Sequence, residues 1–209
     1  MTAHRYNFYK IIHKGIRREL GELLRLAAEL DVDDRDATNP YLARLHASLA
    51  LMGAHAHHED AHIEPLVERF APALARRIFA THRVLDQQEH ELLRRAEVMR
   101  ERADAGHAFY LALTRYVATQ LGHMAEEETE VMELLWEHVS DEDLLAVEGA
   151  IVASCAPEEN AVYMEWMMHG VSEPERVAFL AAMRQAAPPE AVAHAELLAQ
   201  AARESRAAA

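Results

Sequence analysis

The chain is poor in cysteine, in glycine and proline, and in positive charge. A single cysteine, Cys155, occurs among its 209 residues. One thiol cannot form an internal disulfide framework, and it excludes the zinc-ribbon and iron–sulfur sites that need several thiolates. Seven glycines and seven prolines are about half the usual share. This shortage disfavours a turn-rich β-sandwich or barrel and favours helices.

Lysine and arginine number 21 against 35 aspartates and glutamates, so the formal net charge is −14. Because nucleic acids and anionic membranes are themselves negative, we expect the chain to bind neither. No apolar run approaches the ~18 residues of a membrane span, and the opening MTAHRYNFYK does not resemble a signal peptide. With no disulfide framework to indicate an oxidising compartment, the expected location is the cytoplasm.

Helical periodicity organises the first two thirds of the chain. Apolar residues recur at steps of three and four, which predicts four long helices over residues 6–30, 40–69, 72–105 and 107–139. Asn39 and Pro40 are expected to begin the second helix, Pro65 to kink or end it, and Gly106 to end the third. The pattern predicts an all-α protein whose residues 1–139 form an up-down four-helix bundle.

Residues 140–209 have a different sequence pattern. Prolines and Gly170 cut them into pieces of roughly a dozen residues, which predicts three or four short helices packed on the bundle. Ser140, which three acidic residues follow, is expected to cap the first of these helices. The extension could cap the bundle, cover its site or form a homodimer interface, and the sequence leaves these roles open.

Histidine is the residue type in excess, with 14 copies, and two histidine–glutamate pairs lie on apolar helix faces. His55 and Glu59 in the second helix, and His123 and Glu127 in the fourth, are four residues apart and therefore one turn apart. A carboxylate in a helical core is costly unless it is paired or bound to metal. We therefore expect both pairs to face the bundle interior and to hold two metal ions, with each carboxylate bridging them.

The other two helices are expected to supply the remaining ligands. The first offers His13 on its apolar face, and the third offers His90, with His82 as a competitor. His62 lies three residues after the second-helix glutamate on the same face and could be a fifth nitrogen ligand. Asp86 or His82 could also fill that place.

This order of one histidine, His-x-x-x-Glu, one histidine and His-x-x-x-Glu resembles the hemerythrin-like HHE cation-binding family. The resemblance covers residues 6–139, including the segment IHKGIRREL and Pro65, and the C-terminal helices resemble an extension seen in some bacterial members. It implies a non-haem site with two oxo- or hydroxo-bridged iron ions. The ligands that it implies are His13, His55, Glu59, His90, His123 and Glu127.

The ligand set differs from that of the family's oxygen carriers, which use five histidines. Their third helix has two histidines four residues apart, whereas the position four before His90 is Asp86 here. Counting bonds leaves about two open positions on the metals instead of about one, which favours redox chemistry over reversible carriage. Nitrogen and oxygen ligands without thiolate suit iron, manganese or zinc. The bridging carboxylates and the family resemblance imply iron as the expected metal, with manganese and zinc as the alternatives.

The resemblance implies a protein that binds or reacts with O₂, NO or peroxide, in sensing, carriage, oxidative-stress response or iron handling. One alternative is a di-iron oxidoreductase, either an O₂-dependent oxidase or oxygenase or a peroxide-decomposing enzyme. A second alternative is a helical module whose metal is purely structural. Tyr9, four residues before His13, and Tyr116, seven before His123, are expected to line the pocket as hydrogen-bond donors or redox partners.

Overall fold

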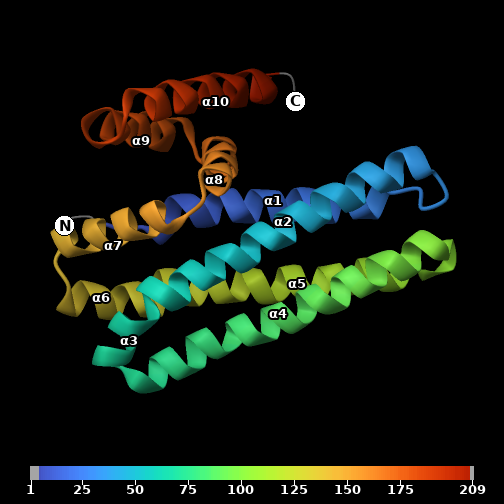
Figure 1. Ribbon diagram of the computed structural model, residues 1–209, viewed down its shortest axis with the longest axis horizontal. Coiled ribbons are helices and arrows are strands. Elements are labelled where there is room, and N and C mark those ends of the chain that lie inside the picture. The colour runs from blue at the N-terminus through green and yellow to red at the C-terminus, as the bar shows by residue number, and fades with distance from the viewer. Residues whose placement is uncertain (1–4, 208–209) are drawn as a thin grey trace. The chain divides into compact units, whose positions relative to one another are not determined.

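A computed structural model describes residues 5–207 of the chain. This range is helical almost throughout and contains no β-strand, which confirms the expected all-α class. None of its helices combines the length and the hydropathy of a membrane span. The elements (Figure 1) are α1 (Tyr9–Glu29), α2 (Arg35–His62), α3 (Glu64–Phe70), α4 (Pro72–Glu101), η1 (Ala103–Ala105), α5 (Gly106–Glu126), η2 (Glu127–Val131), α6 (Met132–His138), α7 (Asp141–Ser154), α8 (Pro157–Gly170), α9 (Glu173–Ala186) and α10 (Pro189–Ala207).

The described residues fall into two compact units. The first unit comprises residues 5–8 together with residues 20–154, and the second comprises residues 9–19 together with residues 155–207. Helix α1 is therefore shared between the units, and α7 belongs to the first one.

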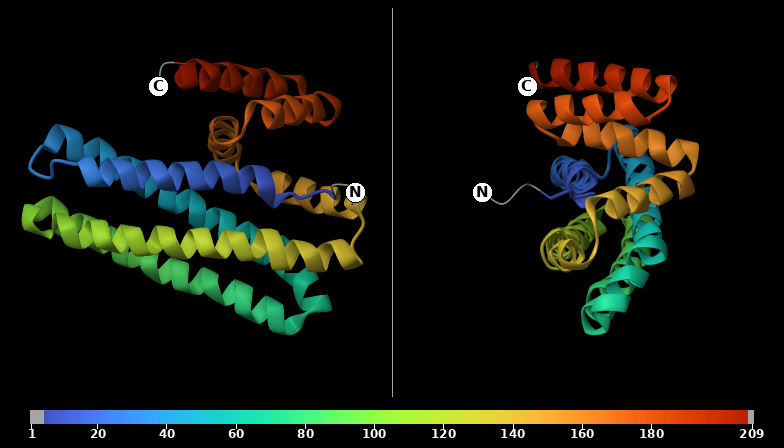
Figure 2. Two further views of the ribbon diagram at one scale, coloured as in Figure 1. Left: turned by 180° about the vertical axis from the view of Figure 1, so that it is seen from behind. Right: turned by 90° about the vertical axis from the view of Figure 1, so that its left-hand side faces the viewer.

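Within the first unit, α2, α4 and α5 run side by side, and each is antiparallel to the next (Figures 1 and 2). Helix α5 continues through η2 into α6 without a break, and this continuous helical segment corresponds to the expected fourth helix. The three helices bury apolar side chains such as Leu49 of α2, Leu92 of α4 and Leu113 of α5. Each such side chain contributes about 1.5–3 kcal/mol to stability when it is fully buried. This packing holds the central parts of the three helices against one another.

Helix α2 begins five residues earlier than expected. The side chain of Asp34 accepts hydrogen bonds from the backbone N–H groups of Asp36 and Ala37, at 2.9 and 3.3 Å. A carboxylate at this position satisfies free N–H groups and interacts favourably with the positive end of the helix dipole. The helix therefore starts at Arg35, and Pro40 lies inside it.

The other two predicted interruptions had different outcomes. Helix α2 ends three residues before Pro65, as predicted. The prediction that Gly106 ends the third helix is wrong, because α4 ends at Glu101 and Gly106 is the first residue of α5. A Cβ atom on Gly106 would lie 2.9 Å from Cγ2 of Val32. Close packing therefore explains this glycine, whose φ is not positive.

Helices α7 to α10 confirm the short helices expected after residue 140, and the backbone N–H of Asp143 donates to Oγ of Ser140 at 3.1 Å, as the predicted cap requires. In the second unit, α8 crosses the first part of α1 at two glycines. A Cβ on Gly15 would lie 2.8 Å from the carbonyl carbon of Trp166, and a Cβ on Gly170 would lie 2.7 Å from Cα of Gly15. Only hydrogen fits at these two positions.

Candidate metal centre

Helix α2 presents His55 and Glu59 one turn apart, as predicted. Nε2 of His55 lies 3.0 Å from Oε1 of Glu59. Glu59 is buried and His55 is partly buried. The sequence pattern therefore indicates the correct face of this helix.

The second predicted pair lies where α5 passes into η2. Nε2 of His123 is 3.1 Å from Oε1 of Glu127, and both residues are buried. Glu127 is the first residue of η2, which is a π-helical turn. A π-helical turn contains one more residue than an α-helical turn. Such turns are rare in proteins overall, and many of those that occur lie at functional sites. This local geometry determines where the Glu127 carboxylate points.

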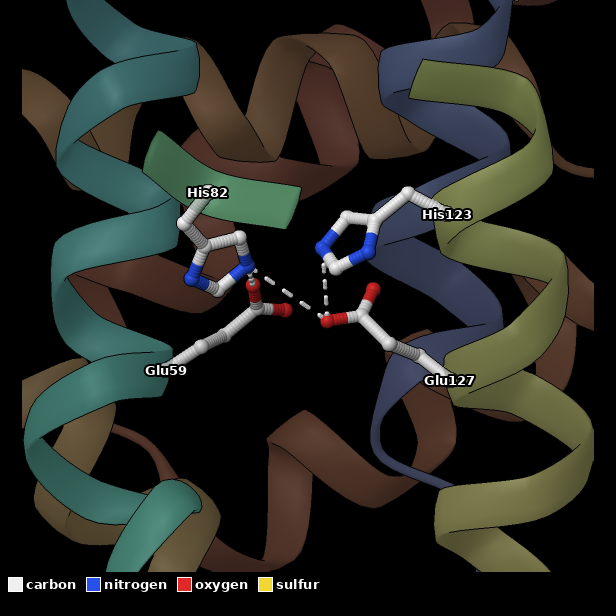
Figure 3. A group of neighbouring side chains, drawn as sticks. All are labelled: Glu59, His82, His123 and Glu127. Carbon is white, nitrogen blue, oxygen red and sulfur yellow. Dashed lines mark ion pairs between the residues drawn. The ribbon is translucent and has the colours of Figure 1, made fainter. Parts of the chain in front are cut away.

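Helix α4 contributes His82, which lies beside Glu59, His123 and Glu127 (Figure 3). Nε2 of His82 lies 3.4 Å from Oε2 of Glu59 and 3.7 Å from Oε1 of Glu127. Its ring also packs edge-on against the ring of His123, with the centroids 4.6 Å apart. One ligand atom from each member of this four-residue cluster, Glu59, His82, His123 and Glu127, lies within 4.8 Å of the others.

The two separations from His82, 3.4 and 3.7 Å, are longer than ordinary hydrogen bonds, and all four separations are compatible with coordination of a shared ion. Two nitrogen or oxygen ligands at about 2.1 Å from one ion lie roughly 3 Å apart. Within residues 5–207, Nε2 of His82 and Nε2 of His123 make no hydrogen bond, although carboxylate oxygens lie nearby. The imidazoles and carboxylates therefore converge on a common region.

Glu59 faces two imidazoles with two different oxygens. Its Oε1 lies 3.0 Å from His55 and its Oε2 lies 3.4 Å from His82. A carboxylate with its oxygens directed in this way can bridge two ions, one beside each imidazole. The bridging role itself stays a prediction from the sequence.

A further carboxylate orients the ring of His82. Oδ1 of Asp60 lies 2.6 Å from Nδ1 of His82. Because an ionised carboxylate only accepts hydrogen bonds, Nδ1–H is the donor, and Nε2 is the nitrogen that can bind a metal ion once it has given up its proton. Carboxylates in this position fix the tautomer and raise the basicity of metal-binding histidines.

The cluster attracts positive charge. Burial would lower the pKa of His82, but the hydrogen bond to Asp60 and the carboxylates of Glu127 and Glu59 raise it to about 12. Burial and the negative charge of Glu59 would raise the pKa of Glu127, but the imidazoles of His123 and His82 outweigh them and lower it. Two buried carboxylates thus favour a cation between them, which a metal ion would supply.

The preference for His90 over His82 is not supported by the structure. The side chain of His90 is 76% exposed, and its Nδ1 lies 2.8 Å from the backbone oxygen of Asp86. Asp86 is also mostly exposed. His90 follows His82 by eight residues, which places it about 12 Å further along α4 and turns it by about 80°. His62 is half-buried and is not part of the four-residue cluster.

His13 and Tyr9 lie in the second unit, on the first part of α1. His13 is fully buried, and its ring stacks on Tyr9 with the centroids 4.7 Å apart. The role of His13 as a ligand stays a prediction from the sequence. Tyr116, the other pocket candidate, is fully buried on α5 in the first unit.

Two features of the site were not predicted from the sequence. Asp60 directly follows Glu59, and its acidic side chain was an available signal, but its partner could be recognised only once His82 was known to face inward. The π-helical turn at Glu127 has no signature in the local sequence AEEETEV.

Comparisons of the chain with protein-family models, with curated proteins and with solved structures give no match.

Proposed function

We propose that this chain is a non-haem di-iron protein that binds or reacts with O₂, NO or peroxide, built on a hemerythrin-like four-helix bundle. The observation that carries the proposal is the buried four-residue cluster of two glutamates and two histidines drawn from three helices. With His55 it offers three imidazoles and two carboxylates, a donor set that suits iron. His13 stays a ligand candidate from the sequence alone.

The residues present fit two ions. Glu59 has one oxygen toward His55 and the other toward His82, while Glu127 lies between His82 and His123. Two iron ions held there would supply electrons to a bound diatomic or peroxide. Asp60 would keep Nε2 of His82 directed at the ions. Buried Met124, which directly follows His123, and buried Val131, four residues after Glu127, would help to exclude bulk water.

Metal reconstitution tests the proposal. After anaerobic incubation with ferrous ion and removal of the excess, we expect about two iron ions per chain. Glu127→Gln should bind markedly less iron, whereas Glu133→Gln, at an exposed position on α6, should bind as much as the unsubstituted chain. A content well below one ion per chain in the folded protein would contradict the proposal.

The reaction with small ligands separates the proposed function from its alternatives. The reduced, iron-loaded protein is mixed with O₂, NO or peroxide, and its visible absorption is followed. A reversible change on adding and removing O₂ or NO supports binding or sensing. Irreversible oxidation or steady consumption of peroxide supports an oxidoreductase. A spectrum that responds to none of the three would leave only a structural role for the metal.

A further inference from the structure

A second polar cluster lies in the core of the first unit, and none of its residues is a proposed metal ligand. The hydroxyl of Tyr116 donates to Oε1 of Glu89 at 2.7 Å and accepts from Nε2 of Gln120 at 3.0 Å. Sδ of Met52 lies 3.3 Å from the same hydroxyl. The phenol has a single proton, and the Glu89 carboxylate is a stronger acceptor than the thioether.

This cluster occupies the core layers next to the metal centre. Tyr116 precedes His123 by seven residues on α5, which is about 10 Å along the helix axis at 1.5 Å per residue. Gln120 lies between them, one turn before His123. Met52 precedes Glu59 by seven residues on α2. The phenol is therefore near the metal ligands without being one of them.

Packing alone does not explain a phenol–carboxylate pair at this depth. Tyr116 is completely buried, and Glu89 is partly buried beside it. Burying these polar groups has a desolvation cost that an apolar pair of similar shape would not have. The cost is offset by the hydrogen bonds that hold the phenolic oxygen between Glu89 and Gln120.

The protonation states suit transfer of a proton between the two side chains. Burial raises the pKa of Glu89 to about 7, while the hydrogen bond from Tyr116 acts in the opposite direction. The carboxyl of Asp86 raises this pKa further, and the imidazole of His90 lowers it. Burial and the charge of Glu89 raise the pKa of Tyr116 well above its ordinary value. The phenol therefore keeps its proton until it loses an electron.

We propose that Tyr116 is a one-electron donor whose phenolic proton passes to Glu89 when the tyrosine is oxidised. The O–H bond of Tyr116 breaks, one electron leaves for the oxidant, and the proton forms a new O–H bond on Oε1 of Glu89. The products are a neutral phenoxyl radical and a neutral carboxylic acid. The N–H of Gln120 still donates to the phenoxyl oxygen. The return of one electron from a reductant and of the proton from Glu89 restores the pair.

The inference rests on the proposed function for its natural oxidant, a one-electron oxidant of the class that ferrous ion and hydrogen peroxide generate together. Such an oxidant produced at the ligands of the metal centre would be about two helical turns from Tyr116. A tyrosine in this position would carry oxidising equivalents away from the histidine ligands. It would also supply one electron to a reaction that needs more electrons than the two metal ions provide.

The test is a radical measurement on the iron-loaded chain. The ferrous protein is mixed with hydrogen peroxide, frozen at successive times and examined by electron paramagnetic resonance. We expect a tyrosyl signal that is lost in Tyr116→Phe and strongly reduced in Glu89→Gln, where the phenol remains but its proton acceptor is gone. Tyr41→Phe is the matched control, because Tyr41 is also buried but its hydroxyl lies near a backbone oxygen, that of Leu23. This control should keep the signal.

A tyrosyl signal that persists in Tyr116→Phe, in a chain that binds iron normally, would overturn the inference and leave the metal centre intact. An unchanged signal in Glu89→Gln would overturn the role of Glu89. Glu89→Gln also carries the test if Tyr116→Phe does not fold, since it leaves the aromatic ring in place.

A second oxidant separates this inference from the proposed function. The metal-free chain is exposed to a photogenerated ruthenium(III) tris-bipyridine complex, which removes single electrons without any bound metal. A buried tyrosyl signal that disappears in Tyr116→Phe supports the pair even if the chain binds no iron. A signal that arises equally in Tyr116→Phe contradicts the pair whatever the metal content.

Discussion

Asp60 and His82 form a contact between α2 and α4 that defines one side of the metal centre. Nδ1 of His82 lies 2.6 Å from Oδ1 of Asp60, and Nε2 of the same ring lies 3.4 Å from Oε2 of Glu59. The two successive acidic residues of α2 therefore contact opposite edges of one imidazole. One orients the ring, and the other is a candidate to share its metal ion.

Asp60→Asn should weaken metal binding while the chain stays folded. The amide keeps the shape of the side chain but removes the negative charge that makes His82 a better ligand. Losses of about 10–100-fold in affinity are typical when such a partner is removed. Equilibrium titration with ferrous or zinc ion measures the change. Asp86→Asn, an exposed change on α4, should not alter the affinity. Equal affinities for both variants would refute the orienting role of Asp60.

His82→Ala and His90→Ala test which histidine of α4 binds metal. His82 is buried in the four-residue cluster, whereas His90 is exposed. We expect His82→Ala to lose at least one of the two ions and His90→Ala to keep both. Metal analysis of the two purified variants, side by side with the unsubstituted chain, gives the answer. The reverse result would favour the choice made from the sequence.

Metal should stabilise the fold through Glu59 and Glu127. A ligand that binds only the folded state at a hundred times its Kd adds about 2.7 kcal/mol to the free energy of unfolding. Thermal unfolding with and without ferrous or zinc ion should show a clear rise in Tm for the unsubstituted chain. The rise should be much smaller in Glu127→Gln and should persist in Glu133→Gln. A rise of equal size in both variants would place the stabilising metal elsewhere.

Two glycines of α1 should respond to alanine in opposite directions. A Cβ on Gly15 would lie 2.8 Å from the carbonyl carbon of Trp166, whereas a Cβ on Gly21 has no neighbour within 4 Å. Gly15→Ala should therefore destabilise the chain, because backbone atoms cannot yield as a flexible side chain would. Gly21→Ala should stabilise it by up to about 1 kcal/mol, since alanine is the better helix former. Urea unfolding of the two variants measures both effects, and a Gly15→Ala chain as stable as Gly21→Ala would contradict this close crossing.

Glu89 should make the chain less stable as the pH rises from about 4.5 to about 7. Burial raises the pKa of this carboxyl in the folded chain to about 7, from an ordinary value of 4.5. Between these values the unfolded chain loses the proton and the folded chain keeps it. The folded state then binds more protons, so the free energy of unfolding falls with pH across this window. Glu89→Gln should remove this contribution to the pH dependence of the free energy of unfolding. Unfolding curves measured at several pH values give that dependence. A slope unchanged by the substitution would mean that Glu89 titrates normally.

The helical class and much of the candidate site could be read from residue spacing. Four-residue steps placed His55 with Glu59, and His123 with Glu127, because side chains four apart share one helix face whatever the tertiary structure. The same logic failed for His90. Leu93, three residues after it, suggested that His90 points inward although its apolar face is less regular, but the structure exposes His90 and buries His82.

Tertiary structure decided the remaining features because they depend on what a neighbouring helix provides. The contact between Asp60 and His82 and the contact between Tyr116 and Glu89 each join residues more than 20 positions apart. The π-helical turn at Glu127 likewise has no signature in the local sequence. The sequence alone determined that this protein is helical, that its only cysteine leaves nitrogen and oxygen as the natural metal donors, and that two His-Glu pairs face the core. Which third histidine joins them, and which carboxylate orients it, depended on the register between helices, which the packing of their side chains sets.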